Sequence, residues 1–162
     1  MLAKAIDSYG LDSREVFAEA DMDHAKLRDP LARFSAHSVW RLWHIAVVRS
    51  GDPCFGLTVA GFWHPTTLHA LGYSWLASNN LAEGFECAAR YTRLVNTAAQ
   101  GVIEIDASGD WYKVSINRSR MHRNPVDAAV DAAQGMLLVM CRAAYGTEFR
   151  LRRVTFRHAE PP

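Results

Sequence analysis

The sequence predicts an α+β fold, in which N-terminal helices accompany a small, mainly antiparallel sheet packed against a long helix. Apolar residues recur at helical spacing up to residue 94, and two alternating stretches follow between residues 102 and 117. A further helical stripe and a last extended segment complete the chain. A strand pair with a helix before it and another after it must bury one sheet face against helices, which is an α+β arrangement.

Length and charge restrict the domain organisation and the partners. The 162 residues suffice for one domain with its own core and are too few for two ordinary ones, so we expect a single domain over residues 1–162. The formal net charge of +1 gives no basic field of the kind that draws a domain to nucleic acid. This chain is therefore not expected to bind DNA by itself.

The cysteines and the N-terminus indicate the compartment. Three cysteines without CxxC spacing fit a reducing environment better than a disulfide framework. The N-terminal residues lack the apolar region of a signal peptide, and no stretch has the length and apolarity of a membrane span. We expect a cytoplasmic protein that does not contact the membrane.

The first helix with a full apolar stripe is predicted over residues 36–50. Ser35 offers an N-cap oxygen, and Gly51 is placed to end the helix. Val39, Trp43 and Val47 lie on the stripe, which favours a core position for Trp43. Shorter helices are expected at three further places, over residues 2–9, 12–20 and 53–61.

Residues 67–94 are predicted to form two helices joined by Ser78-Asn79-Asn80. Asn80 and Glu83 stand at the spacing of a capping box, so the second helix should begin at Leu81. The stretch carries large aromatic side chains that either fill a core or line a cavity, and helical spacing favours core for Trp75. We expect this stretch to join the helical half to the sheet half, with any pocket opening beside it.

Two strands are predicted over residues 102–106 and 111–117, joined by a short polar connection. A helix of about twenty residues should begin after Asn124-Pro125 and end near Gly146, because its apolar stripe is uninterrupted. Residues 149–158 read as a last strand, with alternate residues on one side.

Several short motifs, in this order and spacing, resemble the N-terminal effector domain of one large branch of AraC-type transcriptional regulators, the arabinose-binding-like branch. The resemblance covers nearly the whole chain. The motifs are Gly51-Asp52-Pro53 with Phe55-Gly56-Leu57, Leu71-Gly72-Tyr73, Ala89-Arg90-Tyr91 and Phe156-Arg157-His158.

The resemblance implies a sensor domain that binds a small metabolite, forms a homodimer, and controls DNA only through a C-terminal helix-turn-helix domain. Nothing in this chain resembles that second domain, so the chain is expected to be an excised or truncated sensor. No cofactor and no catalytic activity are expected. The alternative function is a structural or protein-interaction (dimerisation) module that takes no small ligand.

Candidate ligand contacts are aromatic and polar side chains near helix starts or in the motifs, since ligand sites are mostly apolar with a few directed polar groups. For Trp63, Tyr73 and Tyr91 a core position is an equal alternative, and for Arg90 a structural role as a cap or in an ion pair is favoured over ligand contact. The candidates are His44, Trp63, His64, Tyr73, Arg90 and Tyr91.

Metal binding and catalysis find little support in the residue pattern. His64 and His69 have a suggestive spacing, but no Cys, Asp or Glu cluster completes a ligand set nearby, so no metal is expected. The chain contains no recognised catalytic motif. An enzyme using Cys54 or His64 is the third hypothesis, against the simpler reading of Cys54 as a small buried thiol.

Overall fold

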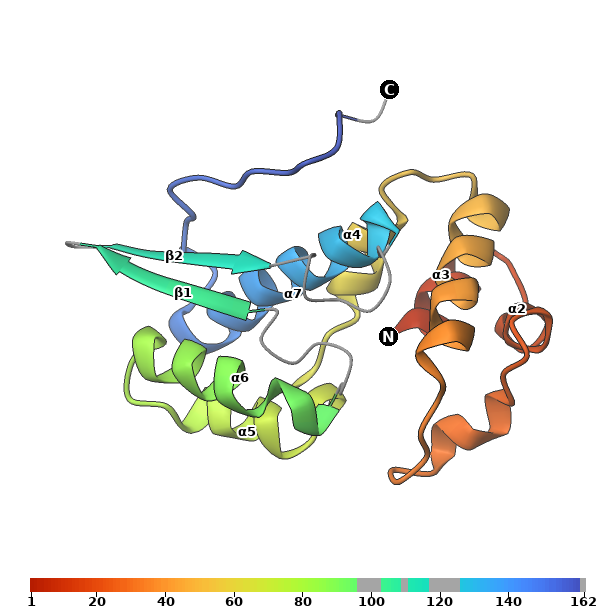
Figure 1. Cartoon of the computed structure of the whole chain (residues 1–162), viewed down its shortest axis with the longest axis horizontal. Coiled ribbons are helices and arrows are strands. Elements are labelled where there is room, and N and C mark those ends of the chain that lie inside the picture. Colours follow the sequence, from red (N-terminus) through yellow and green to blue (C-terminus); the bar gives the residue numbers. More distant parts are fainter. Residues whose placement is uncertain (96–102, 109–110, 117–125, 161–162) are drawn as a thin grey trace. The chain divides into compact units, whose positions relative to one another are not determined.

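Helices account for most of the residues 1–95, 103–108, 111–116 and 126–160, which the computed structural model describes (Figure 1). The predicted α+β fold, with a mainly antiparallel sheet packed against a long helix, is therefore wrong. The only sheet among these residues is a two-stranded hairpin, formed by β1 (Ile103–Ser108) and β2 (Trp111–Ile116).

The predicted last strand over residues 149–158 does not form. Nearly all of these side chains are exposed, and no strand of the described residues pairs with the segment. Alternation of residue types specifies a strand only where a neighbouring strand and a buried face receive it. The two other strand predictions are confirmed, because β1 and β2 pair antiparallel from Ile103 opposite Ile116 to Ser108 opposite Trp111.

The chain divides into two compact units, and helix α7 (Asp127–Tyr145) contributes its first half to one unit and its second half to the other. The predicted helix of about twenty residues is confirmed by α7. The organisation as one domain stays a prediction. The first unit comprises Met1–Phe62, Val126–Gly135 and Thr155–Pro162, and the second comprises Trp63–Pro125 and Met136–Val154.

The first unit is built from short helices around an apolar core. Its buried side chains include Ile6, Val16, Leu42 and Phe55, and Trp43 packs against this core as its spacing predicts. The elements are α1 (Leu2–Ser8), α2 (Ser13–Glu19), the 3-10 helix η1 (His24–Arg28), α3 (Ala36–Ser50), α4 (Phe55–Gly61) and the first half of α7.

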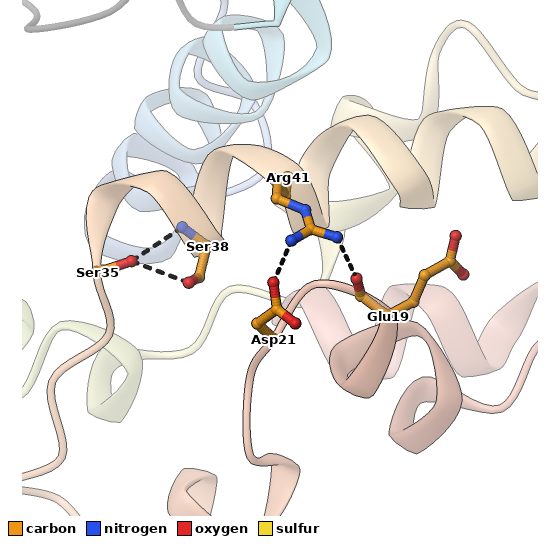
Figure 2. Close-up of polar contacts among 5 residues, drawn as sticks. All are labelled: Glu19, Asp21, Ser35, Ser38 and Arg41. Atoms are coloured by element: carbon orange, nitrogen blue, oxygen red, sulfur yellow. Dashed lines mark hydrogen bonds and ion pairs between the residues drawn. The ribbon is translucent and has the colours of Figure 1, made fainter.

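Helix α3 begins and ends where the sequence predicts. The Ser35 hydroxyl accepts a hydrogen bond from the Ser38 backbone N–H at 3.0 Å, as Figure 2 shows. Gly51 ends the helix with a φ of 66°, a left-handed conformation that glycine adopts without strain.

Arg41 of α3 fastens the C-terminal end of α2 (Figure 2). Its guanidinium donates to the Glu19 carbonyl oxygen at 2.7 Å and pairs with the Asp21 carboxylate. Helix α2 ends in a Schellman-like turn, in which the Met22 N–H donates to the Phe17 carbonyl. A cation at this end is favoured by the helix dipole, and the contact orders the turn between α2 and η1.

Helix α4 packs closely against the first half of α7, with little space for side chains at two glycines. A Cβ on Gly56 would lie 1.9 Å from the Ala128 carbonyl oxygen, and one on Gly135 would lie 2.9 Å from the Ala60 Cβ. Small residues one or two turns apart therefore allow the two helices to approach closely, with the Ala60 methyl group and the Leu57 side chain against Gly135. Gly56 is required here for space, not for its backbone conformation.

The second unit contains the 3-10 helix η2 (Pro65–Leu68), α5 (Ala70–Ala77), α6 (Leu81–Val95), the hairpin and the second half of α7. Helix α6 begins at Leu81 as predicted, because Asn80 accepts a hydrogen bond from the Glu83 N–H at 3.0 Å. The Glu83 carboxylate, however, accepts from the backbone and side chain of Asn79, one residue earlier than predicted.

Replacing Gly56 with alanine is expected to lower the free energy of unfolding by about 3 kcal/mol, because the new Cβ would collide with a helix backbone that cannot move aside cheaply. Gly61→Ala on the same helix is the matched control, since no atom lies within 4 Å of its Cβ position. That variant should leave stability unchanged or raise it by up to about 1 kcal/mol. Chemical denaturation measures both, and equal effects would contradict the close approach.

Candidate ligand-binding site

The second unit contains a buried tryptophan that is fully satisfied. The Trp75 indole N–H donates to the Met140 carbonyl oxygen at 2.9 Å, and only 3% of the residue is exposed. Its ring meets the Phe85 ring edge to face, with centroids 5.0 Å apart. On α6, Gly84 has no side chain and so leaves room for the Trp75 indole. The core position predicted for Trp75 is confirmed.

Trp63 is buried to nearly the same degree, with 8% of the residue exposed, but its polar atom is not satisfied. Its indole N–H has no acceptor among the described residues. Leaving a buried donor unpaired costs about 1–3 kcal/mol, so such groups are uncommon in folded proteins. A ligand oxygen placed at this N–H would remove that cost, which makes Trp63 the centre of the candidate site.

His64 follows Trp63 but is exposed where Trp63 is buried. Its backbone is extended, with φ −142° and ψ 151°. The His64 Nδ1 accepts from the Thr66 N–H at 3.4 Å, while its own backbone N–H donates to the Thr67 hydroxyl at 3.1 Å. His64 therefore caps η2, a structural role for this exposed residue.

A strained backbone separates η2 from α5. His69 has φ 51° and ψ −134°, a region that residues other than glycine rarely adopt and that costs about 1–3 kcal/mol. The turn is also closely packed, because a Cβ on Gly72 would lie 1.9 Å from the Pro65 carbonyl oxygen. The chain enters this strained turn only a few residues after Trp63.

Sequence periodicity over residues 63–69 gave no signal for either feature. The predicted helix start at residue 67 lies inside η2, and the α-helix begins only at Ala70. The Trp63 N–H and the His69 conformation depend on tertiary packing. A Trp-His-Pro sequence between two helices was the one local hint, since Pro65 favours an extended residue before it.

The remaining candidates of this unit lie on the surfaces of α5 and α6. Tyr73 is 56% exposed and Tyr91 is 43% exposed, and Arg90 is exposed without an ion-pair partner among the described residues. In the described part of the unit, no hydrogen bond or ring contact joins any two of the five candidates. Tyr73, Arg90 and Tyr91 lie on consecutive helices, and the five candidates do not form a cluster of contacting side chains.

His44 belongs to the first unit, on α3. Its imidazole stacks on the Trp40 indole, with centroids 5.9 Å apart and planes 4° from parallel. Both residues lie on one helix at i and i+4, the spacing at which helical side chains meet. His44 itself is exposed.

The cysteines and histidines form no reactive or metal-binding arrangement in the part of the chain that is described. No group of three potential ligands occurs there. Burial raises the pKa of the Cys141 thiol to about 11, so this thiol stays protonated at neutral pH. Cys54 is exposed, which corrects the expectation of a small buried thiol at that position.

Comparison with known proteins identifies the class of this domain. The family described as the arabinose-binding domain of AraC transcription regulators, N-terminal, matches residues 10–162. The chain is a ligand-sensing regulatory domain of a transcription regulator. It belongs to the family of N-terminal arabinose-binding domains of AraC regulators, and the resemblance inferred from its motifs is confirmed.

A search of curated proteins returned no match. Across the described ranges, no helix is both long enough and apolar enough to cross a membrane.

Replacing each buried tryptophan of the second unit with phenylalanine tests the difference between them. Both changes remove similar volume, but only Trp75→Phe breaks a hydrogen bond, while Trp63→Phe removes an unpaired donor. Trp63→Phe should therefore be less destabilising by about 2 kcal/mol in chemical denaturation. Equal losses would show that the Trp63 N–H is satisfied in the folded protein.

Proposed function

We propose that this chain senses a small organic metabolite and thereby controls a DNA-binding domain joined to it in the full-length regulator. The family match over residues 10–162 carries this proposal. The metabolite would bind more tightly to one of two arrangements of the protein, since only differential affinity can shift such an equilibrium. The proposed protein is cytoplasmic, carries no cofactor, and performs no chemistry on its ligand.

Trp63 is the proposed anchor of the effector. Its buried ring offers apolar contact, and its unpaired N–H favours a ligand that brings a carbonyl, carboxylate or hydroxyl oxygen to it. The strained turn at His69 lies within the same stretch, where a change of backbone conformation would release strain energy. Both observations support a site at residues 63–69.

The other candidate residues have narrower proposed roles. Tyr73, Arg90 and Tyr91 lie on the two helices that follow, and they would meet the exposed part of an effector or the surface of a partner. His64 would act indirectly by holding η2, because its Nδ1 is engaged with Thr66. His44 has the least support, since it stacks on Trp40 on an exposed face.

A thermal-shift screen of a metabolite library, with arabinose included because of the family's description, tests effector sensing. A ligand at 100 times its Kd adds about 2.7 kcal/mol of stability, which corresponds to a rise in Tm of about 5 to 10 °C. Trp63→Phe should weaken binding about tenfold by calorimetry, through the loss of one hydrogen bond.

Trp43→Phe is the matched control, because it changes a tryptophan packed on the core of the first unit. It should lower the basal Tm without reducing the ligand-induced rise. No stabilisation across a broad library would count against effector sensing. Stabilisation that Trp63→Phe leaves intact would place the effector elsewhere.

The alternative, a dimerisation module without a small ligand, is favoured by one observation. Helices α5 and α6 expose large apolar side chains, among them Tyr73, Leu76 and Tyr91. Grouped apolar surface often marks a protein interface. Homodimerisation of the sensing domain is proposed on the same ground, and the two functions are compatible.

Light scattering measures this second proposal directly. The wild-type chain is expected to have twice the monomer mass, and the double change of Tyr73 and Leu76 to serine should raise the dimer Kd about tenfold or more by removing apolar contact area. Leu31→Ser, on a leucine of the first unit that is 83% exposed, is the control. A monomeric wild-type chain would contradict the proposal.

A further inference from the structure

Among the described residues, His158 is the hydrogen-bonding link between segment 155–160 and helix α7. Every residue of this segment is exposed except His158, and none forms a helix or a strand. Its hydrogen bonds to described residues are those of the His158 imidazole. The Nε2 atom lies 2.8 Å from an Asp131 carboxylate oxygen on α7, and Nδ1 lies 2.8 Å from the Ala159 carbonyl oxygen.

These two contacts define the protonation state of His158. A backbone carbonyl and a carboxylate both accept hydrogen bonds, so both ring nitrogens must donate. A neutral imidazole carries only one N–H, whereas the imidazolium carries two. Both acceptors are satisfied together when His158 is charged and both of its ring nitrogens donate.

The partner of His158 is a buried carboxylate. Only 8% of the Asp131 side chain is exposed, and among the described residues His158 is its hydrogen-bond and ion-pair partner. A buried charge that loses its partner is strongly destabilising. Among the described residues, the charge of Asp127, one turn earlier on α7, also acts on His158.

We propose that the His158–Asp131 pair is a proton-dependent latch, which fastens segment 155–160 to α7 while the imidazole is charged and releases it when the imidazole loses a proton. A neutral His158 can donate to only one of its two acceptors. Asp131 then keeps its charge in a buried position without a counter-charge, unless the segment moves away and admits water.

The pH range of the latch follows from the environment of His158. The Ala159 carbonyl and then the Asp131 carboxylate raise the pKa of His158 above its ordinary value of 6.5. A raised folded-state pKa means that the stabilisation is complete below 6.5 and is lost as pH rises through the higher value. Across that interval the released fraction should grow up to about tenfold per pH unit.

Nuclear magnetic resonance on the whole chain tests this latch. At pH 6, long-range ¹H–¹⁵N correlations of His158 should show two protonated ring nitrogens, and backbone order parameters over residues 156–160 should be close to about 0.85. Above the raised pKa the order parameters should fall below about 0.6. A neutral ring at pH 6, or a segment equally ordered at pH 6 and pH 9.5, would overturn the proposal.

Two variants separate the latch from a general effect of pH. His158→Gln should leave the segment mobile at every pH, and His37→Gln, which changes an exposed histidine of α3, should behave as the wild type. Asp131→Asn should return the His158 titration towards 6.5. A segment that stays ordered in His158→Gln would refute the latch, and the wild-type titration decides the matter even where Asp131→Asn does not fold.

Discussion

The first unit depends on the close approach of α4 to α7. Gly56 lies against the Ala128 backbone and Gly135 lies against the Ala60 methyl group, so two glycines allow the short spacing of the helices. That contact brings a helix from late in the sequence onto the core around Phe55. It also determines where Asp131 lies, one turn after Ala128. Asp131, the carboxylate that pairs with His158, therefore lies on the helix that this contact positions.

The second unit shows how identical side chains acquire different roles from their surroundings. Trp75 and Trp63 are both buried, but one indole N–H ends on a helix carbonyl and the other on no acceptor in the described structure. In a sensing domain, an unsatisfied donor lowers the stability of the empty protein and adds to the affinity for an acceptor. The strained turn at His69 would also lower the stability of the free protein and add to the affinity, because its strain can be released on binding.

Local signals in the sequence predicted the helices well and the sheet poorly. Ser35, Gly51 and Asn80 act as caps or stops where their positions predicted, because capping depends on groups within a few residues. The prediction of a last strand over residues 149–158 was wrong, because a strand needs a pairing partner that is distant in the sequence. The same limit applies to the candidate site. Trp63 is buried whereas Tyr73 and Tyr91 are exposed, and the sequence pattern did not distinguish them. The motif ending in His158 was recognisable, but its contact with Asp131 was not.

The sharing of α7 between the two units has a consequence for synthesis on the ribosome. The first unit needs residues 126–135 to complete its packing, and roughly sixty residues of the second unit are made in between. At about 5 to 20 residues per second, the N-terminal helices wait about 3 to 12 seconds with their apolar faces incomplete. During this interval a nascent chain exposes the surface that α7 will cover. Overexpression at low temperature, or with a holdase chaperone, should therefore favour recovery of the folded protein.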